Sequence, residues 1–180
     1  MANSSTSGTR RQVRDLIQAF ETLLAARLCI IDYVGRLARF IPARSSFHSG
    51  RHCICVKEQC RESRQCGTFD NQVVPQRLRR QRRAFWKFCH GRILELSTPI
   101  MDADVVIGSV ALGQYRWPDG EDLPSDFLTT GHRIRVPESD QHMWDDLPAL
   151  TERERRQREQ VMRAFTDRLE HLIASSSSTP

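Results

Sequence analysis

The chain has 180 residues, of which 39% are hydrophobic and 27% are charged. This size fits one domain with short terminal extensions, and the composition is that of a globular protein rather than a disordered one. The longest mainly apolar run, residues 105–112, is too short to cross a bilayer. The N-terminus also lacks the apolar segment of a secretory signal. We therefore expect a cytoplasmic protein that does not associate with membranes.

The net charge of +5 is unevenly distributed along the chain. Residues 1–100 carry 18 basic and 7 acidic side chains, whereas residues 101–180 carry 9 basic and 15 acidic ones. Such a division predicts a basic face and an acidic face that could contact partners. It does not by itself indicate nucleic-acid binding.

The first half of the chain predicts a helix, a β-hairpin and a less regular segment, in that order. Residues 1–9 form a polar leader that we expect to be disordered, and apolar side chains at helical intervals predict a helix over residues 10–26. Residues 28–33 and 37–41 read as the two strands of a β-hairpin whose turn contains Gly35. The cysteine-rich segment that follows, up to residue 72, predicts loop with one or two short helices.

The second half predicts most of a sheet. Residues 75–83 read as a helix with Pro75 in its first turn. Apolar and alternating patterns then predict strands over residues 85–89, 93–101 and 105–114, with Pro99 marking an edge or bulge position.

The C-terminal part begins with a region rich in Pro, Asp and Gly, residues 117–147, which predicts a long surface loop. An amphipathic helix follows over residues 148–174, with Thr151 and Glu154 at capping-box spacing. Its apolar stripe predicts a core contact or the seam of a homodimer formed through the terminal helices. Residues 175–180 read as a disordered tail. The element order predicts an α+β fold in which an antiparallel sheet carries helices on one face.

Four motifs in order resemble one known family. They are ARLCIIDYVGRL at residues 26–37, a pair of cysteines at Cys53 and Cys66, Cys89-His90-Gly91 followed by Pro99-Ile100, and IGSVALGQ at residues 107–114. Together they resemble the PocR-type sensory domain of bacterial transcription regulators and signalling proteins. The resemblance assigns residues 10–147 to this domain.

The resemblance implies a PAS-like antiparallel sheet with flanking helices that binds a small molecule, with hydrocarbon derivatives such as short diols as proposed ligands. It places Cys53, Cys66, Cys89 and His90 at the ligand site. The family commonly carries an AraC-type DNA-binding pair or a kinase module. After Gln114 this chain offers only a loop and one helix, so we expect it to act through an output protein in trans.

A catalytic role for Cys89 and His90 is disfavoured by geometry. If residues 85–90 form a strand, these adjacent side chains point to opposite faces and cannot form a nucleophile and base pair. No carboxylate pair or triad spacing is present either. We therefore predict a protein that is not an enzyme.

Thiol chemistry leaves a second function open. The six cysteines are Cys29, Cys53, Cys55, Cys60, Cys66 and Cys89. In a chain without a signal peptide they indicate free, buried or metal-binding thiols rather than disulfides. The alternative function is a metal or redox sensor in which Cys53, Cys66 and Cys89 hold zinc or an iron-containing centre. The same residues could instead be small buried side chains that line a pocket.

A third function, nucleic-acid binding, rests on the basic run RLRRQRR at residues 77–83 beside Phe85 and Trp86. Such a run can contact phosphates while the aromatic side chains stack on bases. A solvated helix face explains the pattern more simply, and we favour it.

Overall fold

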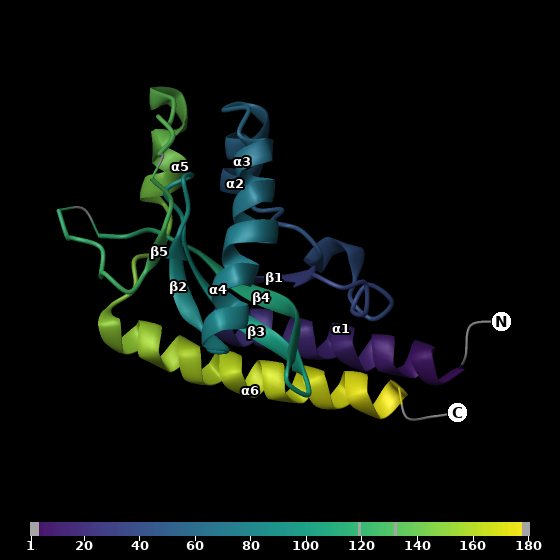
Figure 1. The fold of residues 1–180 in the computed structure, drawn as a ribbon. Helices are drawn as coiled ribbons and strands as arrows, with labels where there is room; N and C mark the ends of the chain where they lie inside the picture. Colours follow the sequence, from purple (N-terminus) through teal and green to yellow (C-terminus); the bar gives the residue numbers. More distant parts are fainter. Residues whose placement is uncertain (1–3, 119, 132, 178–180) are drawn as a thin grey trace.

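A five-stranded sheet lies at the centre of the molecule (Figure 1), in the order β1-β4-β3-β2-β5. The computed structural model describes residues 4–118, 120–131 and 133–177. The strands are β1 (Arg27–Asp32), β2 (Phe85–Phe88), β3 (Leu94–Asp102), β4 (Val105–Tyr115) and β5 (Leu128–Thr129). Four of them pair antiparallel, and β5 adds to β2 in parallel. The α+β class is confirmed, with a sheet that is mixed rather than purely antiparallel.

Helices cover both faces of this sheet, not one face as expected. The long helices α1 (Ser4–Leu24) and α6 (Glu152–Ser177) lie side by side on one face (Figure 1). The other face carries α2 (Arg51–Glu58), α3 (Ser63–Thr68), the π-helical turn η2 (Phe69–Val73) and α4 (Val74–Gln81). Shorter elements are η1 (Ala43–Ser45), η3 (Glu138–Asp140) and α5 (Gln141–Asp145). The sheet is therefore buried on both sides.

The main hydrophobic core lies between the sheet and the two long helices. Val13 and Ile17 of α1 and Leu169 of α6 have no exposed surface, and the rings of Phe20 and Phe165 meet edge to face at 5.1 Å. The stripe of α6 is thus buried within the single chain. The predicted homodimer has no support from this stripe and stays a prediction.

Each long helix extends beyond one predicted end and is shorter than predicted at the other, since α1 ends at Leu24 and α6 begins at Glu152. Helix α1 begins at Ser4, so residues 4–9 are helical rather than part of a disordered leader, and Thr9 is buried against its surroundings. Helix α6 continues to Ser177. The outermost residues, 1–3 and 178–180, lie outside the described residues. The capping box is confirmed, since the Thr151 backbone and hydroxyl both donate to Glu154.

The predicted hairpin is wrong, because β1 pairs with β4 and not with residues 37–41. The reason is Asp32, whose two carboxylate oxygens accept hydrogen bonds from five backbone N–H groups, those of residues 34–38, at 2.7–3.1 Å. This side chain holds the segment in a compact turn, and Leu37 then enters the core. Gly35 does adopt the predicted positive φ, at 77°.

Residues 117–147 are only partly a surface loop. Their buried side chains join a second hydrophobic cluster with Cys55, Val56 and Ile93; they are Ile134, Val136, Trp144 and Leu147. The Trp144 indole donates a hydrogen bond to the Gly91 carbonyl at 2.8 Å. These apolar residues are scattered among Pro and Asp, so their spacing matches neither a helix nor a strand. They nevertheless contribute to this core.

Pro99 lies in β3, which is a central strand and not an edge. A shift of register follows it directly, between Ile100 and Met101, so the predicted irregularity is present.

Across the described ranges of the chain, we find no helix with the length and apolar character that a bilayer crossing requires.

Candidate functional site

The face of the sheet beneath α2–α4 carries charged side chains in a buried position. Lys87 of β2 and Glu95 of β3 are cross-strand partners, and they are only 1% and 4% exposed. Side chains alternate between the two faces along a strand. The residues that flank Lys87 and Glu95 therefore point to the opposite face, where α1 and α6 pack; they are Trp86, Phe88, Leu94 and Leu96. The polar face is therefore a second interior, between the sheet and the short helices.

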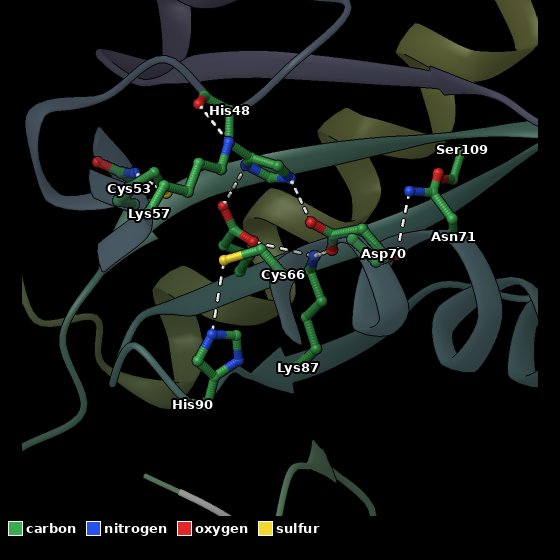
Figure 2. Close-up of polar contacts among 12 residues, drawn as sticks. His48, Cys53, Lys57, Cys66, Asp70, Asn71, Lys87, His90 and Ser109 are labelled. Carbon is green, nitrogen blue, oxygen red and sulfur yellow. Dashed lines mark hydrogen bonds and ion pairs between the residues drawn. The ribbon is translucent and has the colours of Figure 1, made fainter. Parts of the chain in front are cut away.

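Four side chains form a closed cycle of close contacts on this face, which we call the charged ring: His48, Asp70, Lys87 and Glu95. Figure 2 labels His48, Asp70 and Lys87. The Lys87 ammonium lies 2.6 Å from Asp70 Oδ1 and 3.0 Å from Glu95 Oε2. His48 Nδ1 lies 3.0 Å from Glu95 Oε1, and His48 Nε2 lies 3.4 Å from Asp70 Oδ2 without hydrogen-bond geometry. The ring joins a loop, the turn η2 and two strands.

Charge interactions within the ring favour the ionised forms of His48, Lys87 and Glu95. Burial alone would raise the pKa of Glu95, but His48 and Lys87 outweigh it and hold the pKa well below its usual 4.5. Burial likewise opposes the charge of His48 and Lys87, yet Glu95 raises the pKa of His48 and Asp70 raises that of Lys87, each well above its usual value. Buried ion pairs are seldom more stabilising than apolar residues of the same volume. The ring therefore points to function rather than to stability alone.

The ring should make stability depend on pH in two opposite ways. The raised pKa of His48 gives stability that is complete below pH 6.5 and is lost as pH rises through the raised value. The lowered pKa of Glu95 gives stability that is complete above pH 4.5 and is lost as pH falls. In EDTA-containing buffer, we expect the free energy of urea unfolding to fall above pH 6.5. One group contributes a slope of at most about 1.4 kcal/mol per pH unit.

The matched control for this pH dependence is His48→Gln. This variant should show a shallower decline above pH 6.5, because its side chain does not titrate. Equal slopes in the variant and the wild-type chain would contradict the assignment. The buried thiols do not confuse the result, because a raised cysteine pKa costs stability only near pH 9 and above.

A cleft of about 250 Å³ opens beside the ring, between β1 and the segment from η1 to η2. We call it the ring cleft. Its polar walls include Lys57 and Asn71, and its apolar walls include Ile31 and Phe47. The complete lining is Cys29, Ile31, Ser46, Phe47, His48, Lys57, Ser63, Cys66, Gly67, Asp70 and Asn71. A cleft whose lining joins charged side chains such as Lys57 and Asp70 to one apolar side can orient a small molecule that is partly polar.

Two of the predicted site residues meet each other here. Cys66 lines the ring cleft, and its thiol lies 3.5 Å from Nε2 of His90 (Figure 2). Strand β2 ends at Phe88, and the Arg92 N–H donates to the Cys89 carbonyl, so Cys89 and His90 belong to a turn rather than to a strand. The alternation of side chains along a strand therefore does not apply to Cys89 and His90. The thiol beside His90 belongs to Cys66 instead.

His90 also lines a second cleft, of about 310 Å³, on the other side of α3. We call it the His90 cleft; its lining is Arg64, Gln65, Thr68, Phe69, Val73, His90 and Thr130. The pair Cys66 and His90 thus lies in the wall between the two clefts.

The other two predicted cysteines lie close to the ring. The Cys53 thiol accepts a hydrogen bond from Gln114 Nε2 at 2.7 Å, and Cys53 can offer its sulfur to one metal ion together with His48 and Glu95. Cys89 is near enough to Glu95 for the charges to interact. Among the described residues, Cys53, Cys66 and Cys89 do not form a group with ligand atoms within 4.8 Å of one another. The structure brings a different donor set together around Cys53.

Burial raises the pKa of all three thiols, to about 12 for Cys89, and Glu95 raises those of Cys53 and Cys89 further. Without a metal they are protonated at neutral pH, which makes them weak nucleophiles.

The basic run binds largely to its own chain. The guanidinium of Arg77 lies 4.7 Å from the ring centre of Phe85, and Arg79 lies 5.9 Å from that of Tyr33. Arg82 pairs with Asp104 at 3.2 Å. These contacts favour a structural role for the run.

The sequence interpretation missed the charged ring. Lys87 and Glu95 stand between apolar neighbours in FWKF and LELS, which is also the pattern of a sheet with one solvated face. His48 and Asp70 lie in segments without periodicity. A usable signal is that Lys87 in β2 and Glu95 near the start of β3 are each flanked by apolar residues on both sides.

Comparison with known proteins gives one match, to the family described as the sensory domain found in PocR, over residues 9–177. No curated protein and no solved structure matches the chain. The family match covers nearly the whole chain, including every residue of the charged ring and both clefts. The chain therefore belongs to the PocR sensory-domain family and has a sensory, ligand-binding role.

Proposed function

We propose that this protein binds a small hydroxylated molecule, such as a short diol, in the ring cleft. We propose that binding then changes how the sheet packs against α1 and α6. The observation that supports this proposal most strongly is that His48 and Asp70, two members of the charged ring, line the cleft. Ionised groups held in place before a ligand arrives cost little reorganisation when it binds. We further propose that the resulting signal regulates transcription through a partner protein.

The lining of the cleft fits such a ligand in size and polarity. Its volume of about 250 Å³ lies below the range of roughly 300–1,000 Å³ typical of drug-sized ligands. A hydroxyl group can donate to a carboxylate such as Asp70 and can also accept from Lys57 or Asn71. The carbon chain of a diol can lie against Ile31 and Phe47.

Binding without chemical conversion is the simplest activity for this cleft. The Cys66 thiol is protonated because burial raises its pKa, and its neighbour His90 is only 2% exposed. Little of the Cys66 side chain is therefore in the thiolate form that would act as a nucleophile.

We also propose a cytoplasmic location. The six cysteines are free thiols, which supports this proposal.

A direct route leads from the cleft to α6. Asp70 lines the ring cleft and pairs with Lys87 of β2. The adjacent Trp86 points to the opposite face of the sheet, where its indole donates to Glu159 of α6 at 2.6 Å. Arg158, one residue earlier, donates to the Tyr115 hydroxyl at 3.0 Å. A ligand that favours one position of Lys87 would therefore favour one position of β2 against α6. Its effect is limited to the difference in its affinity for the two positions.

The test is thermal and urea unfolding of the full chain with 1,2-propanediol, with 1-propanol as the comparison that lacks the second hydroxyl. We expect saturable stabilisation by the diol alone, of about 2.7 kcal/mol when its concentration reaches about 100 times Kd. Lys57→Met should weaken the effect, because this side chain lies in the ring cleft. Arg64→Met, in the wall of the His90 cleft, should leave it unchanged.

Two outcomes would contradict the proposal. Equal effects of the diol and the alcohol would show solvent action rather than binding. Loss of the effect in Arg64→Met, with Lys57→Met unaffected, would move the ligand to the His90 cleft.

A further inference from the structure

We infer that His48, Cys53 and Glu95 form a binding site for a divalent transition metal, with Zn²⁺ as the first candidate, and that the metal holds the sensed molecule at an open coordination position. The metal site itself does not depend on the proposed function. The ligand-holding role does rest on it. The donor set differs from the three cysteines that the resemblance suggested, since it shares only Cys53 with them.

The first argument is the distances between donor atoms. One ligand atom from each of the three residues lies within 4.8 Å of the other two. His48 Nδ1 and Glu95 Oε1 are 3.0 Å apart. Ligands about 2.0–2.1 Å from a tetrahedral zinc ion lie roughly 3.3 Å from each other. The imidazole and the carboxylate are therefore already spaced for a shared ion, and only a small approach of the thiol is needed.

The second argument is the support around the donors. Gln114 Nε2 donates to the Cys53 sulfur at 2.7 Å, and Gln114 Oε1 lies 2.9 Å from His52 Nδ1. Gly50 makes room for this amide, because a Cβ there would lie 2.3 Å from Gln114 Oε1. Lys57 fixes the loop that carries His48 by donating to its carbonyl at 3.0 Å. Such outer contacts orient metal ligands.

The third argument is charge. Asp70 and Glu95 carry two negative charges in a buried place where Lys87 supplies one positive charge. A divalent ion together with the Cys53 thiolate supplies a net positive charge of one, which balances the two carboxylates and the ammonium.

The fourth argument is chemistry and room. A nitrogen, a sulfur and an oxygen donor suit a borderline-soft ion, and three protein ligands leave the fourth tetrahedral position open. A void of about 30 Å³, next to the ring cleft, is lined in part by His48, Glu95 and Gln114. That is enough for a water molecule, which needs about 10–15 Å³. A hydroxyl of the ligand could take its place.

The test is a Co²⁺ titration of the full chain after removal of metals by EDTA, without any diol. We expect saturation at about one Co²⁺ per chain, with tetrahedral d–d bands and a near-ultraviolet band from the cysteine thiolate. Cys53→Ser should remove the thiolate band and His48→Gln should abolish saturable binding. Gln114→Leu should keep the band and weaken binding by about 10–100-fold. Cys60→Ser is the matched control that should bind as the wild-type chain does.

Three results would overturn the metal site. They are no thiolate band in the wild-type chain, an unchanged band in Cys53→Ser, or loss of the band only in Cys66→Ser and Cys89→Ser, which would favour the three-cysteine set. Circular dichroism of each variant shows that it is folded.

Adding 1,2-propanediol afterwards separates the two proposals. Altered d–d bands support the ligand-holding role. If the diol bound metal-free and Co²⁺-loaded protein with equal affinity, the ligand-holding role would be wrong and the sensing proposal would stand. If the metal bound but the diol had no effect, the ligand-holding role would be wrong and the diol would not be the sensed molecule.

Discussion

The Lys87→Met variant is expected to lose about 3–5 kcal/mol of unfolding free energy relative to the wild-type chain. The reason is that Lys87, 1% exposed, is the shared partner of Asp70 and Glu95. Without it two carboxylates remain in a buried place, with His48 as their shared partner. Urea unfolding at neutral pH in EDTA, followed by circular dichroism, measures the loss.

The matched control is Arg82→Met, which removes an exposed pair with Asp104 and should cost no more than about 1 kcal/mol. Adding Glu95→Gln to Lys87→Met should recover part of the loss, because one unpaired carboxylate disappears. A loss in Lys87→Met as small as that of the control would mean that water reaches the ring. In that event the cleft would lack the dry, fixed charges on which the sensing proposal depends.

The Leu169→Ala variant is expected to lose about 2–5 kcal/mol, because its fully buried side chain leaves a cavity between α6 and its neighbours. This prediction also tests how the apolar stripe of α6 is used. In the structure the stripe packs inside one chain, so the unfolding midpoint of the wild-type chain should not depend on protein concentration. Denaturant unfolding over about a hundredfold range of concentration measures it.

Leu23→Ala serves as the control, since Leu23 lies on α1, is 68% exposed and should contribute little. A midpoint that rises with concentration, and a Leu169→Ala defect that shrinks at high concentration, would show that the stripe also joins two chains. The homodimer would then gain the support it now lacks.

Elements with a strong period were predictable from the sequence, and elements fixed by one polar side chain were not. The apolar stripes of α1 and α6 and the strands β2, β3 and β4 follow directly from spacing. The hairpin prediction failed at Asp32, because its five hydrogen bonds to backbone amides turn the chain away from β1. Nothing in the pattern of LCIIDY distinguishes a capping carboxylate from a solvated one.

The candidate site was predictable only in part. The resemblance singled out Cys66 and His90, which meet in the wall between the clefts, and Cys53, which lies against the ring. Lys87 and Glu95 escaped because a charged residue in an alternating strand normally faces water. Here short helices without clear periodicity cover that face, so the burial of both residues is a tertiary effect.

The partition between the ring cleft and the His90 cleft is α3, a helix of only six residues. Cys66 and Gly67 border one cleft, while Gln65 and Thr68 border the other. If a bound molecule displaced this short helix, one cleft would widen and the other would narrow. Two compounds of suitable shape would then bind with negative cooperativity, and by linkage each would weaken the other by the same factor. The molecule would respond to the ratio of two compounds rather than to the amount of one.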